Sequence, residues 1–517
     1  LKDTNGDDVA DTRKFLFDGW ALGDTHGGVS NFRYGLDNWI YAMQGYNNSA
    51  PTIDGEEQQR FRMGFFRFKP DGSEIEFLRS TNNNTWGLGI SEEGLIFGST
   101  ANHNPSEFMP IPNRYYERVK GWAPERLEGI GDTYKFNPIT DKIRQVDQFG
   151  GYTAAAGHAV YTARTYPKYF WNRTAFTCGP TGHLVGTYQL NPDGAGFHST
   201  NPMNLIASDD EWSAPIMAEV GPDGHVWVID WYNYIVQHNP TPQGFETGKG
   251  NAYMSDLRDK KHGRIYRVVY KAAEKKPQID LTNVSPEELV ATLKNDNMFW
   301  RLRAQRLLVE RGKDDVVPAL LELIKDNSVD ELGLNPGVMH AIWTLKGLGA
   351  ITRQEKPLHN AVVLALAHPS LAVRKVAIQC LPLMERADEI GYVIVSQPFV
   401  EEDSQLQLAA ILAIADATPS EQYESAGDLI ARLSCHQDTL EDRWLKDALI
   451  SAAARHDLHF LATFSKPGVT PRKETYDIVS TVTEHLARSE PSDEIISQLL
   501  TGLQDAEPVL LQTVLTG

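Results

Sequence analysis

The residue pattern of this chain changes abruptly near residue 275, and this change limits the folds that the chain can adopt. Before residue 275, glycine, asparagine, tryptophan and tyrosine are frequent and helical periodicity is absent; after it, leucine, alanine and glutamate dominate. The join is charged and ends at Pro277, as linkers between domains often do. We therefore predict a β domain over residues 1–270, a linker over 271–282 and a helical domain over 283–517.

The first part repeats a short phrase in which a turn that contains glycine precedes alternating apolar residues. The four phrases occupy residues 35–41, 91–97, 179–185 and 221–228. Each predicts a tight turn that leads into a strand, and a spacing of roughly 40 to 55 residues between strand pairs is typical of propeller blades. A closed propeller hides its sheet edges, so many short strands can be stable. Four phrases are too few for a six-bladed ring, so we expect a six-bladed β-propeller that is incomplete at its N-terminus.

The second part shows helical periodicity, for example at Val317, Leu320, Leu321 and Ile324. Residues 285–288 and 418–421 carry the capping signals of helix starts, with proline at the first helical position. Several helices open alike, which predicts HEAT-like helical pairs stacked into an α-solenoid. Each pair leaves an apolar face that a neighbouring pair must cover, and the solenoid offers a surface for protein contacts.

Charge and missing motifs exclude several classes of function. The formal net charge of −19 argues against nucleic acid or an anionic membrane surface as a partner. No run approaches the ~18 apolar residues of a membrane span. The three cysteines form no C-x-x-C pair, so no zinc site, redox motif or haem attachment is predicted. Without a phosphate loop or a nucleophile elbow, nucleotide hydrolysis and covalent acyl transfer are not favoured.

An acidic loop at the start of the chain is a candidate calcium site. Its oxygen ligands, at loop positions 1, 3, 5 and 9, are Asp3, Asn5, Asp7 and Asp11. Alternate spacing turns such side chains toward a hard cation, which suits Ca²⁺. The loop lacks the glycine and the bidentate glutamate of a complete EF-hand, because Asp8 and Lys14 stand at those positions. We expect a structural Ca²⁺ ion here, and the alternative is a solvated acidic turn.

Two histidines are candidates for chemistry. His26 follows Asp24 and precedes two glycines, which let a ligand approach the backbone closely. A neutral imidazole held by a carboxylate can act as a general base. His158 stands in a similar setting, after Gly157. The alternative for both is a structural histidine bonded to a neighbouring blade.

Two further stretches could line a pocket. Asp230 and Trp231 end a predicted strand where aromatic and polar groups meet, an arrangement that suits a sugar or a cofactor. The stretch from Arg164 to Arg173 is basic and aromatic and could face an anionic group. The alternatives are a propeller core with a satisfied aspartate and a solvated face with buried rings.

Several ordered phrases together carry a resemblance to a known family. They lie at residues 3–11, 23–26, 35–41, 176–185 and 221–233. The sequence resembles the membrane-bound dehydrogenase family common in planctomycetes and related bacteria. Members join a propeller similar to that of soluble quinoprotein sugar dehydrogenases to HEAT repeats, and often to a C-terminal c-type cytochrome domain. The resemblance covers the first 270 residues closely and the helical part in architecture.

The resemblance implies a periplasmic or extracellular protein that oxidises a sugar or an alcohol with pyrroloquinoline quinone. In that case His26, with Asp24, would take the hydroxyl proton while a hydride leaves for the quinone. The quinone carries three carboxylates, so its pocket should contain arginine or lysine. The expected cofactor-binding residues are Asn83, Asn84, His158, Arg164, Asp230 and Trp231.

The sequence departs from the family pattern at two points. Those propellers have an Arg-Asn pair where this chain has Asn83 and Asn84, so Asn83 offers no charged group. The haem motif C-x-x-C-H is absent, so a c-type haem would belong to missing sequence or to a partner. The main alternative is a non-catalytic binding protein that recognises a polysaccharide or a protein. A carbohydrate hydrolase or lyase is a further one, and fold alone does not separate these classes.

Overall fold

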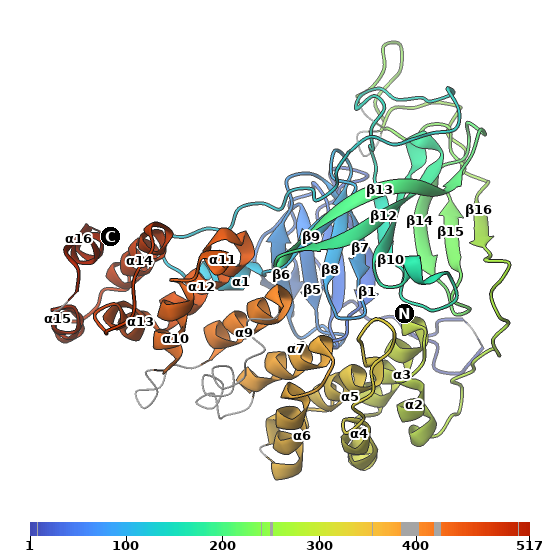
Figure 1. Ribbon diagram of the computed structural model, residues 1–517. Coiled ribbons are helices and arrows are strands. Elements are labelled where there is room, and N and C mark those ends of the chain that lie inside the picture. The colour runs from blue at the N-terminus through green and yellow to red at the C-terminus, as the bar shows by residue number, and fades with distance from the viewer. Residues whose placement is uncertain are drawn as a thin grey trace.

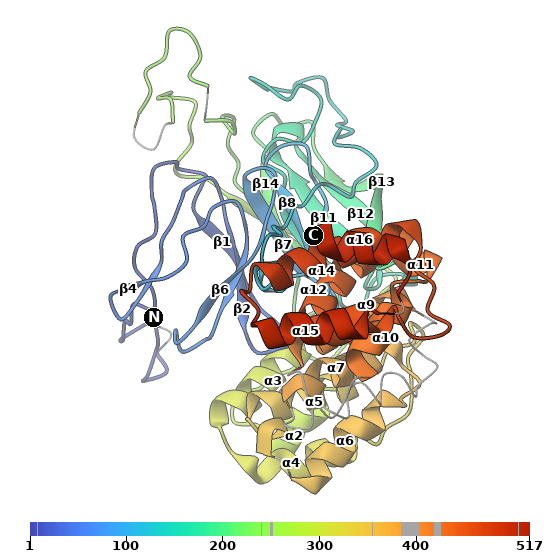
Figure 2. The same ribbon diagram turned by 90° about the vertical axis from the view of Figure 1, so that its left-hand side faces the viewer.

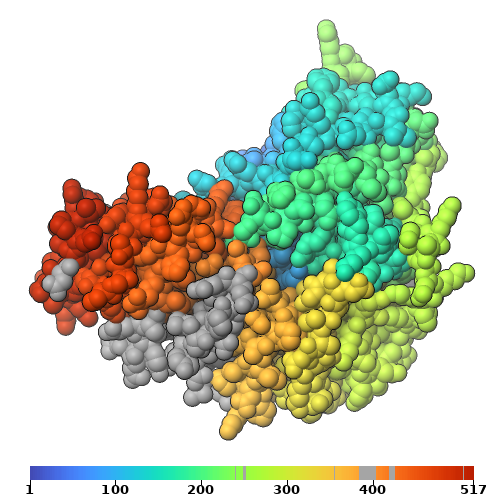
Figure 3. Space-filling view, viewed as in Figure 1, coloured from blue at the N-terminus to red at the C-terminus, as the bar shows by residue number. Residues whose placement is uncertain are grey.

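The computed structural model describes residues 1–517 except 8, 239, 249–251, 354, 384–402, 418–424, 505 and 517. The strands of the first part form a curved fan, and the helices of the second part form a curved row along one side of it (Figure 1; the second view is Figure 2). The space-filling view shows the first helices of the row in direct contact with the strands (Figure 3). The molecule therefore has a propeller-like β part and a helical part.

Apart from one short ribbon, the strands of the described residues form four antiparallel groups, each like a propeller blade. The first contains β1 (Val29–Tyr34), β2 (Ile40–Gln44), β5 (Gly64–Phe68) and β6 (Ile75–Ser80), and the second contains β7 (Thr85–Ile90), β8 (Ile96–Thr100) and β9 (Glu107–Met109). The third contains β10 (Ala156–Val160), β11 (Thr174–Gly179), β12 (Leu184–Asp193) and β13 (Gly196–Ala207). The fourth contains β14 (Pro215–Val220), β15 (Val226–Asp230) and β16 (Arg264–Val268); β3 (Thr52–Ile53) and β4 (Glu56–Glu57) form a separate ribbon. Each predicted turn phrase leads into a strand, namely β2, β8, β12 and β15.

The first strands of neighbouring groups approach each other closely. Strands β7 and β10 pair in parallel at Gly87 and Gly157, which joins the second and third groups into one seven-stranded sheet. A Cβ atom on Gly87 would lie 2.1 Å from Oγ of Ser99, and one on Gly89 would lie 2.0 Å from the carbonyl oxygen of His158. Glycine is therefore required on β7, because a side chain at Gly87 would clash with β8 and one at Gly89 would force the second and third groups apart. The six blades of a complete ring stay a prediction.

The helices after the linker begin at Pro286. They are α2 (Pro286–Thr292), α3 (Met298–Arg311), α4 (Val317–Leu323), α5 (Pro336–Gly347), α6 (Lys356–Leu366), α7 (Leu371–Cys380), α9 (Ser404–Asp416), α10 (Ser425–Leu433), α11 (Gln437–Glu441), α12 (Arg443–Arg455), α13 (Asp457–Thr463), α14 (Lys473–Ala487), α15 (Asp493–Gly502) and α16 (Pro508–Thr516); the short α1 (Asn113–Glu117) lies in the β part. The capping box at Ser285 is present, because its side chain accepts from the Glu288 N–H and the Glu288 side chain accepts from the Ser285 N–H. Residues 418–421 lie outside the described residues. HEAT-type repetition stays a prediction.

One hydrophobic core spans both parts of the molecule. Buried residues of the first two strand groups, such as Met43 and Phe65, belong to the same cluster as the inward faces of the helices. Polar contacts reinforce it: Gln305 of α3 donates to the Leu36 carbonyl at 2.7 Å, and Asn38 donates to the Trp343 carbonyl of α5 at 2.8 Å. The change in composition near residue 275 therefore separates two types of structure that pack as one unit.

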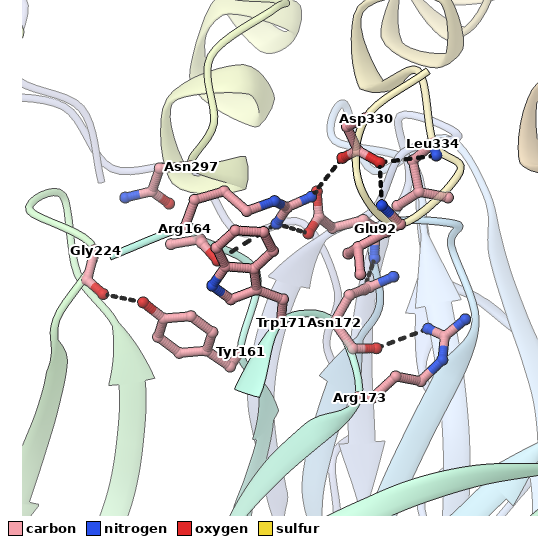
Figure 4. Close-up of polar contacts among 12 residues, drawn as sticks. Glu92, Tyr161, Arg164, Trp171, Asn172, Arg173, Gly224, Asn297, Asp330 and Leu334 are labelled. Carbon is pink, nitrogen blue, oxygen red and sulfur yellow. Dashed lines mark hydrogen bonds and ion pairs between the residues drawn. The ribbon is translucent and has the colours of Figure 1, made fainter. Parts of the chain in front are cut away.

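A buried ion network crosses the same interface. Glu92, in the turn between β7 and β8, accepts from Arg301 of α3 at 2.5 Å and from Arg164 at 2.5 Å. The side chains of Glu92 and Arg301 are fully buried. Arg164 also pairs with Asp330 at 2.9 Å and lies between the two carboxylates, over the Trp171 ring (Figure 4). The network fixes the first helices against the turns of the strands.

Candidate functional site

His26 lies in a tight turn directly before β1. The Asp24 carboxylate accepts the His26 backbone N–H at 2.7 Å, and the Gly27 N–H reaches the Asp24 carbonyl at 3.3 Å. The Asn47 side chain accepts from the Asp24 N–H at 2.8 Å and donates to the Asp24 carbonyl at 2.9 Å. These local bonds hold the turn rigidly, which fixes where the imidazole points.

The His26 imidazole meets side chains from three other parts of the chain. Nδ1 of His26 lies 2.5 Å from Nδ1 of His238, and the two rings are nearly perpendicular. The rings of Trp86 and Trp231 approach edge-on, with centroids 5.4 and 6.4 Å away. Trp86 Nε1 and Asn84 Nδ2 both donate to the His26 carbonyl, at 3.0 and 3.1 Å. The first, second and fourth strand groups thus meet at His26.

Both histidines are kept neutral. Burial lowers the pKa of His26 to about 4, helped by His238 and Arg258 and opposed by Asp24. Burial also lowers the pKa of His238, and there too the Asp24 carboxylate opposes the shift while Arg258 adds to it. A neutral imidazole can accept a proton, so His26 is in the form that a general base requires near neutral pH. Among the described residues, no hydrogen bond reaches Nε2 of His26.

Arg258, which lies near both histidines, and its neighbour Arg144 carry unsatisfied hydrogen-bond donors. Arg258 donates through Nε to the Tyr253 carbonyl at 3.0 Å, and Arg144 donates to the Tyr253 hydroxyl at 2.6 Å. Nη2 of Arg258 and Nη1 of Arg144 are buried and have no hydrogen-bond partner in the described part of the chain. Burial, with Arg144 nearby, lowers the pKa of Arg258. Buried guanidinium donors without an acceptor are costly, and an anion would satisfy them.

Arg258 also lines a pocket of about 740 Å³. Its other lining residues come from the segments before and after Arg258 and include Trp212, Phe245, Met254 and His262. Most of the remaining wall is charged or polar, with two aspartates and two lysines beside the three apolar side chains. Neither histidine of the pair is among the described lining residues, so the pocket lies next to Arg258 rather than at the imidazoles.

Five of the predicted site residues lie near one another, and others do not. Asp24, His26, Asn84 and Trp231 are neighbours, as described above. Asn83 lies beside them, where it accepts from the Tyr46 hydroxyl at 3.0 Å.

Asp230 is occupied by structural bonds. Its carboxylate accepts from the N–H groups of Ala214 and Tyr232 at 2.6 and 2.8 Å, and from the hydroxyls of Ser213 and Tyr266 at 3.1 Å each. The aspartate therefore ties the end of β15 to the neighbouring segments, and it leaves little capacity for a ligand.

Arg164 and His158 lie away from His26. Arg164 is held by Glu92 and Asp330 at the interface with the helices (Figure 4). His158 is fully buried on β10, where Nε2 contacts Ser106 Oγ at 2.9 Å, and burial lowers its pKa to about 3. Neither contacts the histidine pair, so we leave both out of the site proposed below.

The acidic loop is folded on itself. Asp3 accepts from the N–H groups of Asn5 and Gly6, and Asp11 accepts from the Thr4 N–H and from its hydroxyl, the latter at 2.6 Å. Among the described residues, which leave out Asp8, no group of three or more His, Cys, Asp or Glu side chains is placed to hold a metal ion. Calcium binding by this loop stays a prediction.

Three residues of the site could not be recognised from the sequence. His238 lies 212 positions beyond His26 and follows an irregular segment after β15. Arg144 and Arg258 stand in stretches that read as solvated charges. Their role follows from a contact between distant segments, which only the ring-like arrangement of the strand groups creates.

The fold and the site define a propeller-like β domain with a central histidine pair, joined to a helical domain. The model of the family described as "Domain of unknown function (DUF7133)" matches residues 1–272, and the chain belongs to this family. No curated protein matches. None of the described helices is both long enough and apolar enough to cross a lipid bilayer.

Solved structures show distant likenesses. A crystal structure of glucose dehydrogenase is 17% identical over 40% of this chain and 60% of its own, with a TM-score of 0.26. A pyrroloquinoline-quinone-bound aldose sugar dehydrogenase from Streptomyces coelicolor is 11% identical over 44% of this chain and 80% of its own, with a TM-score of 0.22. The CpcE–CpcF complex of phycocyanin lyase from Nostoc sp. PCC7120 is 18% identical over 47% and 99%, with a TM-score of 0.22. These likenesses are too distant to assign an activity, and the resemblance to the membrane-bound dehydrogenase family stays a prediction.

Proposed function

We propose that this chain is a dehydrogenase module that oxidises a sugar or an alcohol with a bound quinone, pyrroloquinoline quinone being the candidate. One observation carries the proposal: the neutral His26 imidazole lies near Arg258, and Arg258 and the neighbouring Arg144 both have buried, unsatisfied donors. A base and a polyanion site in one place are what this reaction needs. Oxidation of a hydroxyl requires removal of a proton, and a quinone with three carboxylates requires cationic partners.

The residues present fit such a cofactor. Nη2 of Arg258 and Nη1 of Arg144 would donate to carboxylate oxygens, which would satisfy groups that are otherwise costly to bury. These two arginines supply the charge that Asn83 does not. When bound, the quinone would supply the acceptor for the hydride, and the protein would supply position and electrostatics.

His26 would take the hydroxyl proton of the substrate at Nε2. The hydrogen bonds from Trp86 and Asn84 to the His26 carbonyl hold the residue in place from the main-chain side. The rings of Trp86 and Trp231 flank the imidazole and partly shield it from water, which favours proton transfer between the substrate and the imidazole. Arg258 opposes a positive charge on His26, so the imidazole stays neutral until substrate arrives.

The proposal also covers the cellular compartment of the protein and the group that accepts electrons from the quinone. We place the protein in the periplasm or outside the cell, and we assign the next electron acceptor to a c-type haem on another segment or a partner protein. The alternative function is a non-catalytic binding protein for a polysaccharide or a protein.

Dye reduction tests the proposal. The protein is incubated with pyrroloquinoline quinone and Ca²⁺, and reduction of an electron-accepting dye is measured over a panel of sugars and alcohols. We expect turnover with at least one substrate and its loss in His26→Gln, since removal of a general base costs about 100- to 10,000-fold in rate. A protein that binds the quinone but reduces no dye with any substrate would favour the binding function.

A further inference from the structure

The histidine pair continues to a carboxylate, and this arrangement determines which nitrogen of His26 carries the proton. Nε2 of His238 lies 3.5 Å from Oδ1 of Asp24, on the far side of the His238 ring from the contact with His26. Asp24, His238 and His26 therefore form a chain of three side chains. The 2.5 Å contact joins two like nitrogens, so one of them must donate and the other must accept.

The protons along this chain can be placed from the carboxylate outward. An ionised carboxylate only accepts hydrogen bonds, and Nε2 of His238 faces Oδ1 of Asp24 at 3.5 Å, so we place the His238 proton on Nε2. A neutral His238 with its proton on Nε2 has a lone pair on Nδ1. That lone pair accepts the hydrogen bond from His26, which must then carry its own proton on Nδ1. Nε2 of His26 is left with a lone pair.

We infer that Asp24, acting through His238, holds His26 in the Nδ1–H tautomer, with the basic nitrogen Nε2 free for substrate. His238 is thus a positioning residue for the proposed reaction, and the inference rests on the proposed function for the base role of His26. The carboxylate does not bond the catalytic ring directly, because a second imidazole stands between them. Asp24 contacts His26 itself through the backbone N–H, at 2.7 Å.

The same chain stabilises the charge that develops during proton transfer. When Nε2 of His26 takes the hydroxyl proton, the Nδ1 proton can shift toward Nδ1 of His238, and Asp24 offsets the positive charge through the Nε2–H of His238. The three side chains gain only the substrate proton and lose no atom. Arg258, the cation beside both rings, opposes this charge, so the carboxylate is the group that favours it.

Nitrogen-15 NMR of the full chain with labelled histidine tests the inference without cofactor or substrate. Two-bond ¹⁵N–¹H couplings distinguish the two neutral tautomers, and His26→Gln and His238→Gln assign the two sets of signals. We expect His26 as the Nδ1–H tautomer and His238 as the Nε2–H tautomer at neutral pH. A wild-type His26 that carries its proton on Nε2 would overturn the inference.

Asp24→Asn tests the role of the carboxylate charge, because asparagine has the same shape but no charge. Oδ1 of Asp24 both accepts the His26 backbone N–H at 2.7 Å and faces Nε2 of His238 at 3.5 Å, so the amide should keep its oxygen there and both tautomers should be unchanged. In the active enzyme kcat should fall about tenfold or more, because the positive charge that develops on the histidines is no longer offset. A wild-type kcat in Asp24→Asn would overturn the role of the carboxylate.

The experiments can contradict the inference about the tautomers and the proposed function independently of each other. If the chain neither binds quinone nor oxidises a substrate, but the tautomers are as stated, the proposed function fails and the inference about the histidine chain stands. If Asp24→Asn does not fold, the assigned wild-type tautomers still decide the inference. Circular dichroism of each variant checks that the fold is kept.

Discussion

Replacing Glu92 with glutamine should destabilise the whole molecule strongly. Glu92 is the carboxylate between two guanidinium groups, and both it and Arg301 are fully buried. The Glu92→Gln variant keeps the shape of the side chain but removes its charge, which leaves Arg301 without a counter-charge. Removal of one partner of a buried ion pair costs about 3 to 5 kcal/mol.

The structure points to the lower end of this range. Arg301 keeps hydrogen bonds to the Asn295 carbonyl at 2.6 Å and to Nε2 of His340 at 3.2 Å. Arg164 keeps its ion pair with Asp330. We therefore expect a loss of about 3 kcal/mol in the free energy of unfolding.

A second ion pair across the same interface provides a matched control. Lys168 of the β part pairs with Glu331 of the helical part at 3.1 Å, and both side chains are more than half exposed. Glu331→Gln should cost at most about 1 kcal/mol, because exposed pairs contribute little. Urea unfolding followed by circular dichroism and tryptophan fluorescence measures both variants. Equal stability of Glu92→Gln and Glu331→Gln would refute the role assigned to the buried network.

Two other predictions concern the acidic loop and the proposed base, His26. The double change Asp3→Ala with Asp7→Ala should lower the melting temperature, because these carboxylates accept the backbone N–H groups of their own loop, and it should abolish any rise in that temperature on addition of Ca²⁺. A melting curve that is unchanged by the substitutions and by Ca²⁺ would contradict the calcium prediction. For the reaction, kcat/KM should stay level down to a pH near the His26 pKa of about 4 and then fall about tenfold per pH unit, since the base is lost once its folded-state pKa is crossed. An acid limb near the ordinary histidine pKa of 6.5 would show that another group is the base.

Features that depend on neighbours in sequence could be predicted from the sequence. The turn phrases can be recognised because glycine and polar residues determine a tight turn locally. Each of these turns leads into a strand of the structure. His26 was recognisable because an aspartate and two glycines flank it. The capping box at Ser285 is equally local and is present.

Features that depend on distant contacts could not be predicted. His238 meets His26 because the fourth strand group lies beside the first, and no local pattern marks that contact. The sequence does not distinguish an arginine that pairs with a buried glutamate from an arginine that binds an anionic ligand. Arg164 pairs with Glu92. Arg144 and Arg258, which resemble solvated charges in the sequence, have the unsatisfied donors.

We propose that Arg258 and Arg144 bind a polycarboxylate quinone near His26. Equilibrium titration of the protein with pyrroloquinoline quinone, followed by quenching of tryptophan fluorescence, tests this binding, since Trp86 and Trp231 flank His26. Arg303→Met is the matched control, because Arg303 also covers an aromatic ring and bonds a backbone carbonyl, but on α3. We predict saturable binding that weakens about 10- to 100-fold in Arg258→Met and is unchanged in Arg303→Met. Absence of binding, or equal binding by both variants, would contradict the account.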